Sequence, residues 1–228
     1  MSATGIAFEI PSVFREVVPG LSPAQAEAEV RAHLEAEGGT VPPPGRIAPL
    51  AAAYEKTSAL LATTDIRYAA TCFRRFRGAW SVGTLTLGLS PLTYRDTAAA
   101  LAGIGTVLAE RGSGTDARTL ELPCGTAAFT VRRPEPARVS TGGAGPDAAG
   151  SADSSAATAQ LQVFIPVPPE AVPGAQSLAT VVFSAPGADP WAEHWALVLP
   201  FLRSLRFVPE GVRDRAPAGA GAGWEDAA

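Results

Sequence analysis

The feature that most constrains the fold is the stretch at residues 160–208, which holds the densest apolar run of the 228-residue chain. Residues 161–167 (LQVFIPV) alternate with a period of two, and residues 178–183 (LATVVF) form a β-branched and aromatic run. Both patterns are typical of strands in a partly buried sheet. Prolines and a glycine separate the two runs, so the stretch predicts two strands joined by a loop.

An amphipathic helix is predicted to follow these strands, over residues 190–204. Asp189 and Pro190 favour a helix start, because Asp accepts a hydrogen bond from an otherwise unpaired N–H and Pro lacks that donor. Five apolar side chains then recur at spacings of four and three, which places them on one helical face: Trp191, Trp195, Val198, Leu202 and Leu205. Pro200 interrupts this pattern without ending it, so we expect a kink within a continuing helix.

The first third of the chain predicts a short strand at residues 6–11 and two helices. Ser22 and Gln25 form a capping box around Pro23, which marks the start of the first helix. Its apolar stripe is thin and consists of Ala26, Val30 and Leu34. The second helix is predicted from about residue 47 to residue 62, with an apolar face of Ile47, Leu50, Tyr54 and Leu61.

Two hairpins are predicted in the middle of the chain. Residues 66–89 form the first, with a two-residue turn at Gly78–Ala79 that pairs Cys72 with Leu85 on a mostly apolar face. We therefore expect Cys72 to be buried. A helix over about residues 93–110 follows, and the second hairpin spans residues 118–132, with its turn at Pro123, Cys124 and Gly125.

The predicted fold class is α+β, a mainly antiparallel sheet of about five to seven strands with helices on its faces. Residues 1–209 make a single domain. Residues 134–158 interrupt it with a segment dominated by Pro, Gly, Ala, Ser and Asp, which lacks the apolar side chains that offset chain ordering. We expect this insert, and the tail at residues 210–228, to be disordered.

Composition argues against several functional classes. The net charge is −4 and no basic block occurs, which argues against a nucleic-acid partner. Two cysteines and two histidines give neither a disulfide framework nor metal-ligand spacing, so no metal or cofactor is expected. We see no signal-peptide pattern and no apolar run of about 18 residues, so the expected location is cytoplasmic, with no membrane partner.

The motifs from the first hairpin onward resemble the PsbP-like superfamily of photosystem extrinsic subunits, Ran-binding import factors and small bacterial lipoproteins. The resemblance covers about residues 66–208 and rests on LPCGTAAFTV, LQVFIPVP, LATVVFSAP and a Trp-led helix that ends in RSLRF, with IAFEIP resembling the first strand. It implies an α/β/α sandwich and a binding or assembly role. The paired helices before residue 66 and the insert depart from the superfamily pattern, and no binding residue carries over by motif.

The residues with candidate chemistry are few. Cys124 beside a turn glycine would be a nucleophile if a base lowered its pKa, but no His, Lys or Arg is adjacent, so we favour a structural role. His194 is predicted to be a helix histidine whose hydrogen bonds are satisfied, and His33 to be solvated on a Glu-rich helix. Arg67, Arg75 and Arg77 are the candidate site for an anion or an acidic partner, although we favour a solvated sheet face or edge whose charges discourage edge pairing.

The sequence therefore favours a cytoplasmic, non-enzymatic protein-interaction or assembly factor with an unidentified protein partner. The alternative is a small-molecule-binding or hydrolytic enzyme that uses Cys124 or an arginine-lined anion site. A phosphate-binding loop is not evident, because Gly103 and Gly105 fall inside a predicted helix. The oligomeric state does not follow from these patterns.

Overall fold

The computed structural model of this protein describes residues 4–36, 43–64, 66–76, 79–110, 117–132, 158–173, 176–186 and 191–209. Its helices are α1 (Pro23–Ala36), α2 (Pro44–Thr63), α3 (Thr97–Glu110) and α4 (Trp191–Ser204). Its strands are β1 (Thr4–Ala7), β2 (Phe14–Glu16), β3 (Ile66–Phe76), β4 (Ala79–Pro91), β5 (Arg118–Leu122), β6 (Gly125–Arg132), β7 (Thr158–Pro166), β8 (Ser177–Pro186) and β9 (Arg206–Pro209). Several predictions fall outside the described residues: the cap at Asp189–Pro190, the turn residue Gly78, the insert up to residue 157 and the tail.

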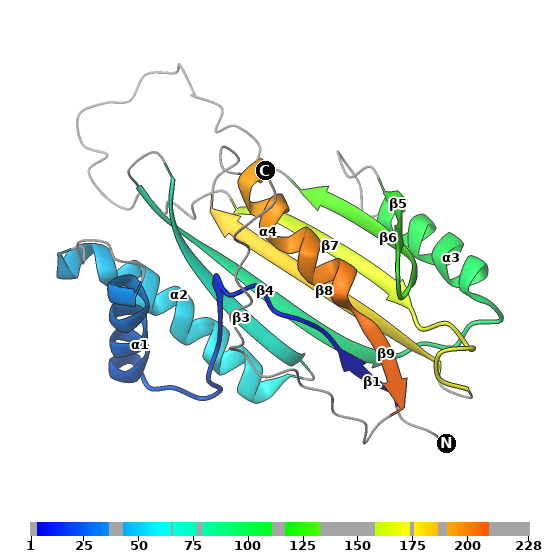
Figure 1. Ribbon diagram of the computed structural model, residues 1–228, viewed down its shortest axis with the longest axis horizontal. Helices are drawn as coiled ribbons and strands as arrows, with labels where there is room; N and C mark the ends of the chain where they lie inside the picture. Colours follow the sequence, from blue (N-terminus) through cyan, green and yellow to red (C-terminus); the bar gives the residue numbers. More distant parts are fainter. Residues whose placement is uncertain are drawn as a thin grey trace, which may run out of the picture.

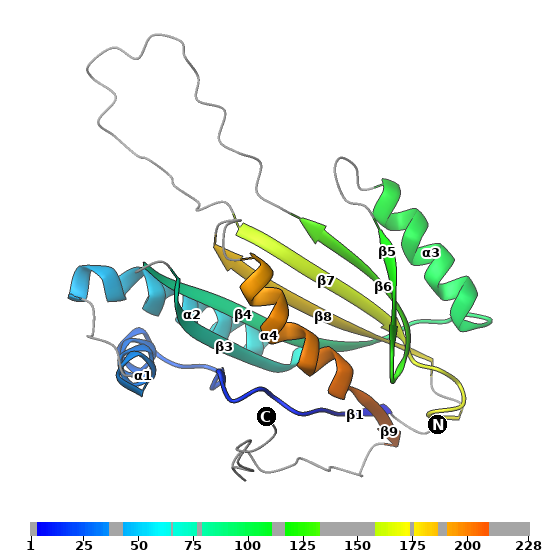
Figure 2. The same ribbon diagram turned by 45° about the horizontal axis from the view of Figure 1, so that its top comes forward.

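The strands form a seven-stranded antiparallel sheet in the order β2-β3-β4-β8-β7-β6-β5 and a two-stranded ribbon of β1 and β9. This arrangement confirms the predicted fold class. Helix α4 packs against one face of the sheet, which we call the first face, and α2 and α3 lie on the opposite, second face (Figures 1 and 2). On the second face α2 packs on β3 and α3 packs on β6 and β7.

The first face is a continuous apolar layer. Alternate residues of β3, β4, β7 and β8 are fully buried there, among them Ala70, Leu85, Leu87, Leu161, Val163, Val181 and Phe183. Helix α4 covers this layer with Val198, Phe201, Leu202 and Leu205, and it continues through Pro200 as predicted. Its buried face is rotated from the predicted one: Trp195 is only half-buried and packs on Phe129 at 6.2 Å, whereas Phe201 is fully buried.

The register of the first hairpin differs by two residues from the predicted one. Cys72 lies opposite Gly83 instead of Leu85, although it is fully buried as expected, because a shift of two keeps each side chain on its face. A Cβ atom on Gly83 would lie 2.6 Å from the ring of Phe183 and 2.8 Å from Sγ of Cys72. The space that only glycine leaves opposite Cys72 thus accommodates the Phe183 ring from a third strand, which the hairpin sequence alone does not reveal.

The second face carries a smaller core under α1 and α2. The predicted stripe of Ala26, Val30 and Leu34 is fully buried, and it packs with Ile47, Tyr54, Ala69 and Phe73. The expected capping box is present, since the backbone N–H of Ser22 donates to Oε1 of Gln25 at 3.0 Å. His33 is not simply solvated: it is half-buried, with its ring 5.4 Å from Phe73 and 5.9 Å from Tyr54. The aromatic neighbours come from α2 and β3, which explains the error.

Between α2 and α3 the second face is mainly polar, with the half-buried Val182 of β8 between Thr86 and Gln162. The polar side chains there are half-buried and uncharged, and we call them the polar strip: Thr84 and Thr86 of β4, Thr180 and Ser184 of β8, and Gln160 and Gln162 of β7. Three of them form a hydrogen-bonded chain, in which Gln162 donates to Gln160 at 2.8 Å and Gln160 donates to Ser184 at 3.3 Å. Toward α2, Val82 of β4 belongs to the same core as the buried residues of α1 and α2.

Several element boundaries differ from the predictions for local reasons. Helix α2 begins at Pro44, where proline suits the first turn, and not at residue 47. Helix α3 begins at Thr97, because Oδ1 of Asp96 accepts a hydrogen bond from the N–H of Ala99 at 2.7 Å and caps it. The second hairpin turns at Pro123 and Cys124, and Thr158, assigned by sequence to the insert, is the first residue of β7.

The N-terminal segment contributes strands to two sheets instead of one. The strand predicted at residues 6–11 is β1, Thr4–Ala7, and it pairs antiparallel with β9. The chain then crosses to the edge of the main sheet, where β2 pairs with β3. Neither β2 nor β9 was predicted, because strands of three and four residues are too short to show a period. Within the described residues, no helix is long and apolar enough to cross a membrane.

Candidate functional site

Two of the three arginines proposed from the sequence lie far apart. Arg67 and Arg75 are both exposed on β3, but they are eight positions apart, which is roughly 26 Å along a strand. Two guanidinium groups at that separation cannot bind one small anion. Arg77 lies outside the described residues, so the predicted site stays a prediction.

Cys124 is also placed unfavourably for nucleophilic chemistry. Its side chain is only 8% exposed and belongs to the core of the first face. Burial raises the pKa of the Cys124 thiol, and the charge of Arg206 offsets only part of this effect. The thiol is therefore protonated at neutral pH, whereas nucleophilic attack requires the thiolate. His194, the other candidate, is 1% exposed and lies with its ring 5.4 Å from that of Phe183.

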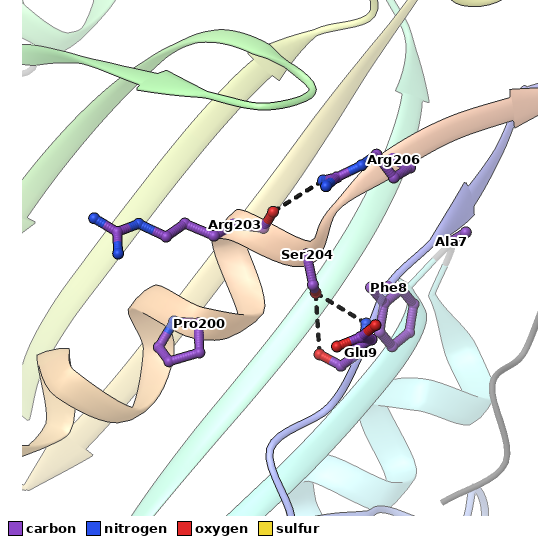
Figure 3. Close-up of a pocket in the computed structure, with 7 residues that line it drawn as sticks. All are labelled: Ala7, Phe8, Glu9, Pro200, Arg203, Ser204 and Arg206. Atoms are coloured by element: carbon purple, nitrogen blue, oxygen red, sulfur yellow. Dashed lines mark hydrogen bonds between the residues drawn. The ribbon is translucent and has the colours of Figure 1, made fainter. Parts of the chain in front are cut away.

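The described residues enclose a pocket where the end of α4 meets the segment after β1. Its volume is about 480 Å³, and Figure 3 shows its lining: Ala7, Phe8, Glu9, Pro200, Arg203, Ser204 and Arg206. This volume is within the range of ligand sites, roughly 300–1,000 Å³. We call it the α4 pocket. No cluster of three or more potential metal ligands occurs in the part of the chain that the structure describes.

Ser204 joins the two walls of the α4 pocket. Its Oγ accepts a hydrogen bond from the backbone N–H of Glu9 at 2.9 Å and lies 3.1 Å from the carbonyl oxygen of Glu9 (Figure 3). It also lies 2.8 Å from the carbonyl oxygen of Phe201. Residues 195 positions apart are therefore held together by one hydroxyl group. The backbone of Glu9 is already engaged, so a ligand here would be recognised mainly through side chains.

Arg206 closes the C-terminal end of α4. Its Nη1 donates to the carbonyl oxygen of Arg203 at 2.9 Å and to that of Leu205 at 2.7 Å. Carbonyl groups at a helix end have no intrahelical partner and carry a partial negative charge, so a cation is favourable there. These bonds hold one guanidinium group in place beside the α4 pocket.

The α4 pocket has a charged rim and an aromatic wall. Glu9, Arg203 and Arg206 are exposed, and Figure 3 shows the Arg203 side chain extending away from Arg206. The wall is the ring of Phe8, which packs edge-on against Tyr68 at 4.8 Å and Phe201 at 5.3 Å. An aromatic surface beside several charged groups suits a side-chain contact with both apolar and ionic parts.

Sequence reasoning did not identify this site. Arg203 and Arg206 were noted only as the end of the motif RSLRF, and Glu9 only as part of a first strand. A cation within the last turn of a predicted helix was the available signal, since cations favour helix C-termini. That Glu9 lies beside Ser204 follows from the pairing of β1 with β9, which the sequence did not indicate.

Comparisons with known proteins identify no family for this chain. No family model matches it, and no curated protein matches it by sequence. Among solved structures it is similar to LpqN of Mycobacterium tuberculosis, a protein described as involved in cell envelope biogenesis. The two chains share 9% sequence identity and superpose with a TM-score of 0.45 over 91% of this chain and 86% of LpqN. A TM-score below 0.5 does not establish a common fold.

Proposed function

We propose that this protein is a non-enzymatic protein-interaction or assembly factor that accepts a segment of a partner protein in the α4 pocket. The observation that carries the proposal is the pocket itself, in which an aromatic wall, a hydrogen-bonded Ser204 and two arginines lie at the junction of α4 and the N-terminal segment. These groups can bind a side chain, but none of them is a protonation partner or an activated nucleophile for the others.

The alternative is a hydrolytic or small-molecule-binding enzyme that uses Cys124 or an arginine-lined anion site. Cys124 is buried and has a raised pKa, which disfavours it as a nucleophile. Labelling with a thiol-reactive probe at pH 7 separates the two proposals. We expect Cys124 in the folded protein to react far more slowly than in the urea-unfolded chain, with Cys72→Ala used to isolate its signal. Reaction of the folded protein at the unfolded rate or faster would favour the enzyme.

The proposed function is tested by affinity capture with wild-type protein and two charge-reversal variants. Arg203→Glu changes the rim of the α4 pocket, whereas Arg95→Glu makes the same charge change at a side chain that is 87% exposed, before α3. We expect a specific partner to be recovered by the wild-type protein and by Arg95→Glu, and to be depleted with Arg203→Glu. Equal recovery with all three proteins would contradict a role for the α4 pocket.

The PsbP-like resemblance and the cytoplasmic location stay predictions. An antiparallel sheet with helices on both faces is the architecture that this resemblance implies, but a shared architecture does not identify a family or a partner. Fractionation of the source cells would test the location. Recovery of the partner from the same fraction would connect it with the proposed function.

A further inference from the structure

We infer that the α4 pocket selects acidic segments, in which a carboxylate lies next to an apolar side chain. This inference rests on the proposed function and specifies the partner chemistry of the same site. The rim carries two cations, Arg203 and Arg206, against one anion, Glu9, so its local charge is 2 − 1 = +1. The chain as a whole carries −4. The α4 pocket is thus a cationic point on an anionic protein, and it favours an anionic ligand.

The hydrogen bonds around Arg206 remove an objection to anion binding at this position. A helix C-terminus repels anions, because its last carbonyl groups carry a partial negative charge. Here Arg206 donates to the carbonyl groups of Arg203 and Leu205, which compensates part of that charge. The same bonds fix Arg206 before a ligand arrives, so less side-chain entropy is lost on binding. Arg203 is exposed and its side chain extends away from Arg206, so it adds a separate positive charge to the rim and does not bind the same carboxylate.

The apolar half of the ligand is defined by Phe8 and Pro200. Phe8 is held between Tyr68 and Phe201, so its ring presents a fixed surface to the α4 pocket. Pro200 is exposed on α4 and adds a rigid apolar contact. Because the backbone of Glu9 is bonded to Ser204, strand addition at that residue is disfavoured. The recognised feature is therefore an acidic side chain beside an apolar one.

Neutralising Glu9 tests the inference, because the direction in which the affinity changes depends on the charge of the ligand. If the ligand carries a carboxylate, Glu9 repels it, and neutralising Glu9 should tighten binding. If the ligand is neutral or basic, neutralising Glu9 should leave binding unchanged or weaken it. Arg203→Glu should act in the opposite direction. A general loss of structure would weaken binding in both variants and cannot produce opposite changes.

The experiment measures fluorescence anisotropy with two labelled peptides, one that repeats Asp-Leu and one that repeats Asn-Leu. We expect the acidic peptide to bind the wild-type protein about fivefold more tightly or better, with an advantage that shrinks as salt increases. Glu9→Gln should tighten acidic-peptide binding about two- to fivefold, Arg203→Glu should weaken it about three- to tenfold, and Arg95→Glu should leave it unchanged.

Two outcomes would overturn the inference: no preference for the acidic peptide, or weaker acidic-peptide binding to Glu9→Gln. The inference and the proposed function can fail separately. If the captured partner is lost with Arg203→Glu but the peptides show no charge preference, the result would support the proposed function and contradict the preference for an acidic ligand. Equal recovery of the partner with Arg203→Glu and the wild-type protein would contradict both the proposed function and the inference.

Discussion

The two faces of the seven-stranded sheet are built by the same strands but have different chemistry. On the first face, Leu85, Val163 and Phe183 lie under α4 in a dry, fully buried layer. On the second face, the neighbouring positions are the half-buried Thr84, Gln162 and Ser184, and hydrogen bonds through Gln160 connect the last two. On the second face α2 packs on β3 and α3 on β6 and β7, and Val82 of β4 joins the core under α1 and α2.

This difference indicates which parts of the molecule carry stability. Burial of apolar surface contributes about 25 cal/mol per Å², so the first face and α4 dominate the stability of the fold. The polar strip gains little from burial, because its side chains exchange water hydrogen bonds for internal ones of similar strength. The α4 pocket lies at the end of the helix that covers the first face, so the proposed site is attached to the most stable layer of the protein.

The largest expected effect is at the centre of the first face. Phe201→Ala removes a fully buried ring that α4 packs against the sheet, and it should cost about 3–5 kcal/mol of unfolding free energy. Leu60→Ala is the control, because Leu60 is 46% exposed on α2 and its truncation should change stability by less than about 0.5 kcal/mol. Urea unfolding measures both. Similar costs for the two variants would contradict the assignment of the core to the first face.

Alanine substitutions of two glycines of β4 compare how tightly the two faces are packed. Gly83→Ala places a methyl group 2.6 Å from the Phe183 ring on the first face and should cost about 1–3 kcal/mol. Gly88→Ala projects into open space on the second face and should stabilise the protein by about 0.4–1 kcal/mol, because it restricts the unfolded chain. Thermal unfolding would give the sign of each change. A stabilising Gly83→Ala would show that the strand register is wrong.

The connection between β6 and β7 gives the third effect. The two strands are neighbours as predicted, with Arg132 opposite Gln160, so the ends of the insert are held by the ladder. Replacing residues 135–157 with a short Gly–Asn turn should stabilise the protein by roughly 1 kcal/mol, because loop-closure cost rises only with the logarithm of loop length. Denaturant unfolding checks this. Loss of the fold would mean that the insert contributes contacts that the account omits.

The smallest effect is expected in the polar strip. Thr86→Val keeps the β-branched shape and removes a hydroxyl that donates to the carbonyl of Val182 at 3.5 Å, a long hydrogen bond. The unfolding free energy should therefore change by no more than about 0.5 kcal/mol. A cost above about 2 kcal/mol would show that the second face is as tightly packed as the first.

The elements that sequence reasoning predicted well are those fixed by local chemistry. The capping box of Ser22 and Gln25, the stripe of Ala26, Val30 and Leu34, and the turn at Cys124 all appear as expected, because each depends on residues within a few positions. Antiparallel pairing followed from the two predicted hairpins, and the alternation in β7 indicated which side chains share a face, since its period is two.

The features that were missed depend on contacts between distant segments. Gly83 lies opposite Cys72 because Phe183 occupies the space, and Phe183 is 100 residues further along the chain. The α4 pocket exists because β1 pairs with β9 and brings Glu9 to Ser204. Arg203 and Arg206 carried no motif that would have predicted the site. Only the topology places them beside Phe8.

Photocrosslinking from two positions tests the central claim, that the protein binds its partner at the α4 pocket. A photoreactive amino acid replaces Ala7, which lines the α4 pocket, in one variant and Thr86, in the polar strip on the opposite face of the sheet, in the other. The account predicts that the captured partner is crosslinked from position 7 and not from position 86. Crosslinking from position 86 alone would place the interaction on the second face and contradict the account.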